Sequence, residues 1–206
     1  NYMKIIKEAC VGNYMEAKRA YELGADRLEL CHNLKEGGTT PSYGTILLAK
    51  ENLNLKINVI IRPRGGSFVS TEEEIQVMEK DIEICKNLKV DGVVIGALTE
   101  DNEIDEIAIK RLVKKAGDLS ITFHMAFDEI DDKKKALDKL VELGIDRVLT
   151  KGGQGKALDN QESLKELVEY ARKRIIILAG GGVTKDNYTE LVRNTGVMEV
   201  HGTKIV

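Results

Sequence analysis

The feature that most constrains the fold of this chain is a regular recurrence of short runs rich in β-branched and aliphatic residues. Eight such runs occur, and successive runs start 22, 30, 35, 28, 27, 28 and 22 residues apart. Runs of this length and composition predict strands. The predicted strands are residues 5–10, 27–31, 57–61, 92–95, 120–124, 147–150, 175–179 and 197–201.

The stretches between these strands have the apolar spacing of helices, clearest in residues 72–88, 104–116, 133–143 and 160–172. Strands that alternate with helices in units of about 25–30 residues form a parallel sheet. Eight such units predict an α/β fold, a closed TIM-type barrel of eight parallel strands. The alternative is an open doubly wound sheet, which usually has about five or six strands.

Two identical turn phrases support repeated units. Residues 23–27 and 143–147 each read Leu-Gly-x-Asp-Arg, in which Gly ends a helix and Arg opens the next strand. No Pro-rich or Ser-rich linker interrupts the pattern, so we expect residues 1–206 to form a single domain.

The end of the pattern predicts an incomplete outer ring. Only residues 202–206 follow the last predicted strand, too few for an eighth outer helix. We therefore expect Ile5, Met198 and Val200 to lack a helical cover, which is unfavourable by about 25 cal/mol per Å² of apolar surface. A homodimer is the expected cover, and residues 204–206 are a second candidate.

Composition excludes several classes of protein. Lys and Arg number 31 against 34 Asp and Glu, and the chain has no Trp, so it is a poor candidate for binding nucleic acid. No run of about 18 apolar residues predicts a membrane span, and no signal peptide is recognisable. Three cysteines without a secretory signal predict free thiols and a cytoplasmic protein.

Three predicted strands end in a glutamate two residues before a candidate metal ligand. The pairs are Glu8 with Cys10, Glu29 with Cys31, and Glu199 with His201. Side chains alternate between the two faces of a strand, and Leu28 and Leu30 suit the helix-facing side. Glu29 and Cys31 then point into the barrel lumen.

The last strand of a closed barrel neighbours the first, so the two thiols and the imidazole of His201 converge at one mouth. Soft thiolates select Cu(I) or Zn(II). Burial as small packing side chains explains Cys10 and Cys31 equally well, and we expect Cys85, on a helical stretch, to be packing.

An arginine pair follows the third predicted strand. Arg62 and Arg64 flank Pro63, whose fixed φ makes a rigid turn suited to binding an anion. The alternative is that Arg62 neutralises Glu8 and Glu29 inside the barrel.

A histidine ends the fifth predicted strand. Active sites of such barrels lie at the carboxyl ends of the strands, so His124 is a candidate general acid/base, and a satisfied structural histidine is the alternative. Asp128 is expected to orient His124 or, preferably, to cap the next helix.

Glycine-rich loops follow the sixth and seventh predicted strands. Their backbone N–H groups suit a phosphate group, and loops in this part of a barrel commonly bind one. The candidate anion-binding residues here are Lys151, Gly181, Gly182 and His201, and tight turns alone are the alternative.

Seven segments of the chain together resemble the CutC family, which is named for copper homeostasis. They are residues 28–31 (LELC), 36–42 (EGGTTPS), 61–66 (IRPRGG), 122–128 (TFHMAFD), 147–150 (RVLT), 179–183 (AGGGV) and 199–202 (EVHG). The resemblance implies a cytoplasmic TIM-type barrel linked to copper handling, with Cu(I) bound through cysteine. On this chain, that role falls to Cys10 and Cys31.

Two functions follow as hypotheses. The first is a copper homeostasis protein with copper as its cofactor, bound as Cu(I) by the two thiolates. The second is an enzyme that acts on a small anionic or phosphorylated metabolite. Its candidate residues are Arg62 and Arg64 as the anion grip, His124 as general acid/base, Glu8 or Glu29 assisting, and Gly181 and Gly182 at the phosphate.

Overall fold

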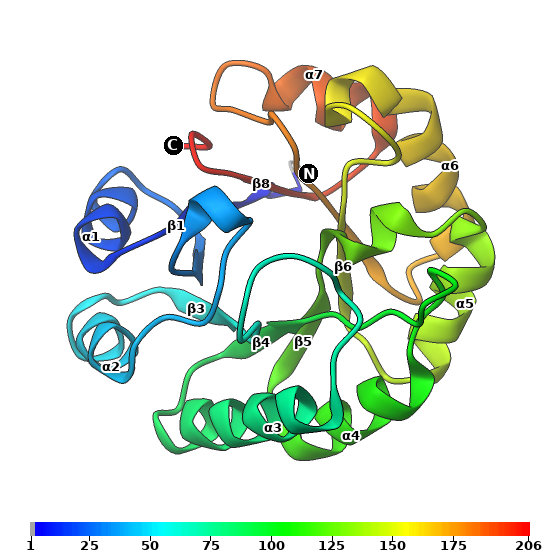
Figure 1. Cartoon of the computed structure of the whole chain (residues 1–206). Helices are drawn as coiled ribbons and strands as arrows, with labels where there is room; N and C mark the ends of the chain where they lie inside the picture. The colour runs from blue at the N-terminus through cyan, green and yellow to red at the C-terminus, as the bar shows by residue number, and fades with distance from the viewer. Residues whose placement is uncertain (1–2) are drawn as a thin grey trace.

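The computed structural model describes residues 3–206 and shows eight parallel strands closed into a barrel (Figure 1). The strands pair in chain order, and β8 pairs with β1 to close the ring. The closed TIM-type barrel predicted from the strand spacing is confirmed, and the open doubly wound sheet is excluded. The strands are β1 (Ile6–Val11), β2 (Arg27–Leu30), β3 (Lys56–Ile60), β4 (Gly92–Ile95), β5 (Ser120–Phe123), β6 (Arg147–Thr150), β7 (Ile176–Ala179) and β8 (Glu199–Gly202).

Seven α-helices, counted over residues 3–206, surround the barrel as an outer ring (Figure 1). They are α1 (Tyr14–Glu22), α2 (Tyr43–Asn52), α3 (Glu72–Asn87), α4 (Glu106–Ala116), α5 (Lys133–Glu142), α6 (Gln161–Ala171) and α7 (Tyr188–Thr195). Short 3₁₀ turns η1 (Leu34–Glu36), η2 (Met125–Glu129) and η3 (Ala157–Asn160) follow β2, β5 and β6. None of the helices in this part of the chain has the length and apolar content needed to cross a membrane.

Capping side chains explain where several helices begin. Thr71 accepts a hydrogen bond from the Glu74 backbone N–H, and the Glu74 side chain returns one to Thr71, which starts α3 with a capping box. Asp132 caps α5 by accepting from the Lys135 N–H. The capping role expected of Asp128 is therefore wrong, because Asp132 lies at the position that needs a cap.

The flank beside β1 and β8 is covered differently from the prediction. Val200 is fully buried within the single chain, so its expected exposure is wrong. The segment after β8 folds back, with a bridge between Thr184 and Lys204 and with Ile205 completely buried. Figure 1 shows the C-terminal end of the chain between α7 and α1. Residues 204–206, the second candidate, thus cover apolar surface on this side.

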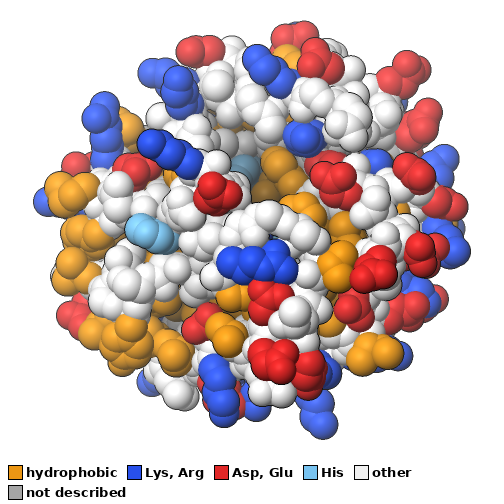
Figure 2. Space-filling view, in the orientation of Figure 1, with side chains coloured by type: hydrophobic (Ala, Val, Ile, Leu, Met, Phe, Trp, Pro, Cys, Tyr) orange, Lys and Arg blue, Asp and Glu red, His pale blue; other side chains and the backbone are white. Residues whose placement is uncertain are grey.

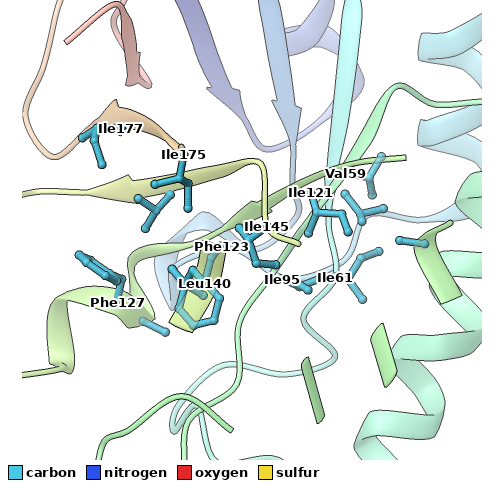
Figure 3. Packing of buried hydrophobic residues seen from close by; sticks show 14 of the residues in the cluster. Val59, Ile61, Ile95, Ile121, Phe123, Phe127, Leu140, Ile145, Ile175 and Ile177 are labelled. Carbon is cyan, nitrogen blue, oxygen red and sulfur yellow. The ribbon is translucent and has the colours of Figure 1, made fainter. Parts of the chain in front are cut away.

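The barrel sorts its side chains into two environments. Outward-facing residues such as Val59, Ile95 and Phe123 pack against helix residues such as Leu140 and form the main core (Figure 3). The inward-facing positions of several strands instead carry buried polar and charged groups. These lumen residues include Glu8, Arg27, Glu29, Asn58, Thr122, Arg147, Glu199 and His201.

Candidate metal centre

An ion-pair network lies in the barrel lumen below the mouth. Arg27 donates from Nε to Glu8 Oε2 and from Nη2 to Glu199 Oε1, each at 2.5 Å. Arg147 donates to the same Glu199 oxygen at 2.7 Å and also to the Thr122 hydroxyl. Both arginines are more than nine-tenths buried. Two cations therefore balance the two carboxylates and hold them in place.

The cation that neutralises Glu8 is Arg27, and the alternative role given to Arg62 is wrong. Arg62 donates instead to the backbone carbonyls of Glu36, Gly38 and Gly66 at 2.7–3.0 Å. Its guanidinium fastens the loops after β2 and β3 to each other. Its pKa is lowered by burial and by the neighbouring Arg64 charge.

His201 and Glu8 form the upper edge of this network. The Nδ1 atom of His201 lies 2.7 Å from Glu8 Oε1, and the two residues are register partners on β8 and β1. Burial opposes charge on Glu8, but the hydrogen bond with His201 and the charge of Arg27 outweigh it and lower the Glu8 pKa to about 2. Burial likewise disfavours the imidazolium of His201, but its hydrogen bonds with Cys10 and Glu8 raise the His201 pKa.

Glu29 lies between the two thiols. Its Oε1 atom is 3.1 Å from Cys31 Sγ and 3.7 Å from Cys10 Sγ. The candidate ligand atoms of these three residues all lie within 4.8 Å of one another. The other carboxylate oxygen, Oε2, is buried and has no hydrogen-bond partner among residues 3–206.

Burial and the neighbouring groups separate the proton affinities of this cluster. Burial raises the pKa of Glu29 to about 8. The Cys31 thiol donates a hydrogen bond that favours the Cys10 thiolate, and His201 adds a second, so the Cys10 pKa falls to about 5. The Cys31 pKa rises well above its usual value because Cys31 is the donor of that pair and is buried. One thiolate is therefore present at neutral pH.

A second candidate ligand group shares Glu29 with the first. Glu8, Glu29 and His201 also place ligand atoms within 4.8 Å of one another. The residues come from the adjacent strands β1, β2 and β8, or directly follow β2 in the case of Cys31. The sequence prediction that thiols and imidazole gather at the mouth thus agrees with the structure, in which Glu29 joins them.

The remaining anion-binding candidates are not gathered at one place. Arg64 pairs with Glu74 at 2.5 Å and donates to the carbonyls of Ser67 and Val69 in an exposed loop. This loop follows β3, whereas Gly181 follows β7, and three strands separate β3 from β7 in either direction around the barrel. Arg64 and Gly181 therefore lie on opposite sides of the mouth.

The loops after β6 and β7 do contact each other. The Lys151 side chain packs over Gly181 and that of Lys156 over Gly182, where both glycines have positive φ. Because an added Cβ on Gly181 would lie 2.5 Å from Lys151 Cγ, this close approach requires glycine. His201 borders the same region, since its Cδ2 lies next to Gly180.

His124 has the geometry of a structural histidine. Its Nδ1 atom accepts a hydrogen bond from the Ala126 N–H at 3.2 Å, and its ring lies against Gly96 and Phe68. Burial, aided by the Arg62 charge, lowers its pKa to about 3, so it is neutral at pH 7. Asp128 does not orient it: the carboxylate accepts from the Thr150 hydroxyl and the Lys151 N–H.

The face that carries the mouth is shown in Figure 2. Lys, Arg, Asp and Glu side chains gather around its periphery, and hydrophobic side chains are visible in the recessed centre (Figure 2). Cys10 is half-buried, while Cys31 and His201 are buried. The cluster is therefore below the rim, with Cys10 as its partly accessible thiol.

Fold and cluster together define a TIM-type barrel protein with a thiol, carboxylate and imidazole centre at the carboxyl ends of its strands. The chain belongs to the CutC family, whose model matches residues 5–206. A CutC family protein of Parabacteroides distasonis is 52% identical over 157 residues, which cover 76% of this chain and 65% of that protein. The human "Copper homeostasis protein cutC homolog" is 45% identical over 154 residues, covering 75% of this chain and 56% of the human protein.

The structural comparison gives the same family. A crystal structure of CutC from Streptococcus agalactiae superposes with a TM-score of 0.94 at 43% identity, covering 98% of this chain and all of that one. The chain spans less than two thirds of the length of the Parabacteroides and human relatives. The resemblance to this family stated from the sequence motifs is confirmed.

Proposed function

We propose that this protein takes part in copper homeostasis by binding Cu(I) through the thiolates of Cys10 and Cys31. The observation that carries the proposal is the thiol pair itself, with both Sγ atoms and a Glu29 oxygen within 4.8 Å of one another. Thiolate–metal bonds are about 2.3 Å for zinc, so two sulfurs on opposite sides of one ion lie about 4.6 Å apart. Soft thiolates favour Cu(I) among the ions of the cell.

The position of the pair also supports this function. Cys10 is partly accessible from the mouth, and its lowered pKa supplies a thiolate without prior loss of a proton. The human relative carries copper homeostasis in its name.

Competitive titration tests the proposal. Cu(I) is titrated anaerobically against bicinchoninate for the wild type, for Cys10→Ser combined with Cys31→Ser, and for Cys85→Ser. Cys85 is the matched control, since it is a buried thiol on α3 outside the cluster. We expect the double variant to lose at least about 100-fold in affinity, because oxygen is a poor ligand for Cu(I). Equal affinity of the double variant and the wild type would refute the proposal.

The alternative function is an enzyme that acts on a small anionic or phosphorylated metabolite. It draws on fewer residues than the sequence predicted, since Arg62 and Arg64 are occupied by backbone carbonyls and Glu74. The contact between Lys151 and Gly181 beside His201 is the observation that favours it. Thermal shift with phosphate and sugar phosphates, compared between wild type and Lys151→Ala, tests it: a bound anion raises the Tm of the wild type only.

The cytoplasmic location, the single-domain organisation of residues 1–206 and the homodimer stay predictions of this proposal. The burial of Val200 within one chain removes one reason for a dimer. Sedimentation velocity at micromolar concentration tests the dimer, and a monomer at all concentrations would contradict it.

A further inference from the structure

We propose that the same cluster also binds a divalent ion of the zinc class, using Glu29 and His201 as ligands in addition to Cys10 and Cys31. The inference rests on the proposed function only through the shared thiol pair. Cu(I) needs the two sulfurs alone, whereas a divalent ion needs the harder oxygen and nitrogen donors as well.

The first observation is the state of the Glu29 carboxylate. It is 4% exposed, its Oε1 atom contacts both thiols, and its Oε2 atom has no partner among residues 3–206. A buried carboxylate oxygen without a partner is costly, and a cation is the partner that such an oxygen binds best. Oε2 is thus a vacant donor inside a group that already contains two sulfurs.

The second observation is the orientation of His201. Glu8 holds its Nδ1 atom at 2.7 Å, so Nε2 is the ring nitrogen that remains for a ligand. Metal-binding histidines commonly donate their other ring N–H to a carboxylate, which fixes the ring and raises the basicity of the ligand. Glu8 is itself held by Arg27, so the supporting shell is complete before any ion arrives.

The third observation is that Glu29 belongs to both ligand groups. Cys10, Glu29 and Cys31 form one, and Glu8, Glu29 and His201 form the other, each within 4.8 Å. An ion bound by Glu29 between the groups has sulfur donors on one side and the imidazole on the other. Two sulfurs, one oxygen and one nitrogen make the tetrahedral mixed donor set that Zn²⁺ accepts, with bonds of about 2.0–2.3 Å.

The donors come from a rigid part of the fold. Cys10, Glu29 and His201 lie on the adjacent strands β1, β2 and β8, and Cys31 directly follows β2. Only side-chain rotation is needed to bring the four atoms to bonding distance from one centre. Sites built on strands hold their ligands more accurately than sites built on loops.

Co²⁺ titration tests the inference, because Co²⁺ takes zinc sites and its spectrum reports both the ligands and the geometry. The protein is reduced, freed of metal and titrated with CoCl₂, after which Zn²⁺ is added in competition. We expect sulfur-to-cobalt charge-transfer bands, intense visible bands of a tetrahedral site, and loss of both when Zn²⁺ is added.

Two variants separate this site from the Cu(I) site. We expect His201→Ala and Glu29→Gln each to weaken Co²⁺ binding by about tenfold or more. The same variants should change Cu(I) affinity by no more than about threefold, because two thiolates suffice for Cu(I). His32→Ala is the matched control, since His32 is exposed in the loop after β2. Circular dichroism and the Tm verify that each variant is folded.

The outcomes are distinct. Co²⁺ binding without charge-transfer bands, or equal Co²⁺ affinity of His201→Ala and wild type, overturns the inference. If Glu29→Gln fails to fold, the His201→Ala comparison decides alone. Loss of Cu(I) binding with Co²⁺ binding intact refutes the proposed function and leaves this inference standing, and the reverse result does the opposite.

Discussion

Glu8 and His201 are 193 residues apart in the chain, yet Glu8 Oε1 lies 2.7 Å from His201 Nδ1 in the barrel lumen. The contact spans the seam where β8 pairs with β1 and closes the barrel. The other oxygen of Glu8 accepts from Arg27 at 2.5 Å, and Glu8 is fully buried. One carboxylate therefore joins barrel closure, the lumen ion pairs and the candidate metal centre.

Replacing this carboxylate should destabilise the protein strongly. Glu8→Gln leaves Arg27 with Glu199 as its only carboxylate partner inside the barrel. Removing one partner of a buried ion pair costs about 3 kcal/mol or more, because the remaining charge stays out of water. Urea unfolding at pH 7 measures the change in the free energy of unfolding.

Glu142→Gln is the matched control for this measurement. Glu142 pairs with Lys139 on the surface of α5, where water screens the interaction, so we expect a far smaller effect. Equal destabilisation by Glu8→Gln and Glu142→Gln would contradict the role given to Glu8.

The fold was predictable because its signals are local. Strand length and composition, helix periodicity and the turn phrase at residues 23–27 and 143–147 each act over a few residues. The errors lie at the ends of elements. The predicted strand over residues 120–124 ends at Phe123, because His124 leaves the strand to cap η2 through its Nδ1 atom.

The candidate site was predictable only in part. Strand alternation placed Glu29 and Cys31 in the lumen, and the same alternation would have placed Arg27 beside them. Arg62 was misassigned because a long guanidinium side chain can reach either the lumen or the loop carbonyls. Which one it reaches depends on the path of residues 36–38 and on Gly66, and that path is set by tertiary packing.

The pH dependence of stability should report Glu29. Burial raises its pKa in the folded protein to about 8 from a usual value of 4.5. Its contribution to stability is therefore fully present below pH 4.5 and is lost as the pH rises towards 8 and beyond. Glu29→Gln removes the titrating group, so we expect it to flatten the decline of unfolding free energy between pH 5 and 9.

This comparison is made on reduced, metal-free protein in EDTA, since a bound ion would hold Glu29 ionised. Denaturant unfolding across the pH range gives the two curves. Parallel curves for Glu29→Gln and the wild type would show that Glu29 titrates normally in the folded protein.

Cys10 should be the most reactive of the three thiols. Its pKa is lowered to about 5 by hydrogen bonding from Cys31 and His201, and it is half-buried, whereas Cys31 and Cys85 are buried with raised pKa values. An ordinary thiol is only about 3% ionised at pH 7, since its pKa is about 8.5. Brief treatment with iodoacetamide at pH 7, followed by peptide mass mapping, should therefore label Cys10 first.

His201→Ala should slow this labelling, because the variant lacks one of the two hydrogen bonds to the thiolate. Cys85 in the same digest is the internal control and should remain unlabelled until the protein unfolds. Faster labelling of Cys31 or Cys85 than of Cys10 would contradict this ordering.

Gly96 should tolerate no side chain, because the imidazole of His124 occupies the space beside it. A Cβ on Gly96 would lie 2.3 Å from Cε1 of His124, and the ring is held by the Ala126 N–H and packed against Phe68. Overpacking a buried site of this kind costs about 1–3 kcal/mol. We expect Gly96→Ala to lower the free energy of unfolding by that amount.

Gly44→Ala gives the opposite sign and serves as the control. Gly44 is in the first turn of α2 with no atom within 4 Å of an added Cβ, so alanine should stabilise by about 0.5–1 kcal/mol. His124→Ala should cost less in the Gly96→Ala background than in the wild type, because truncating the ring relieves the clash. Additive effects of the two substitutions would mean that the ring moves aside freely, and that His124 is not held in place by its contacts with Ala126 and Phe68.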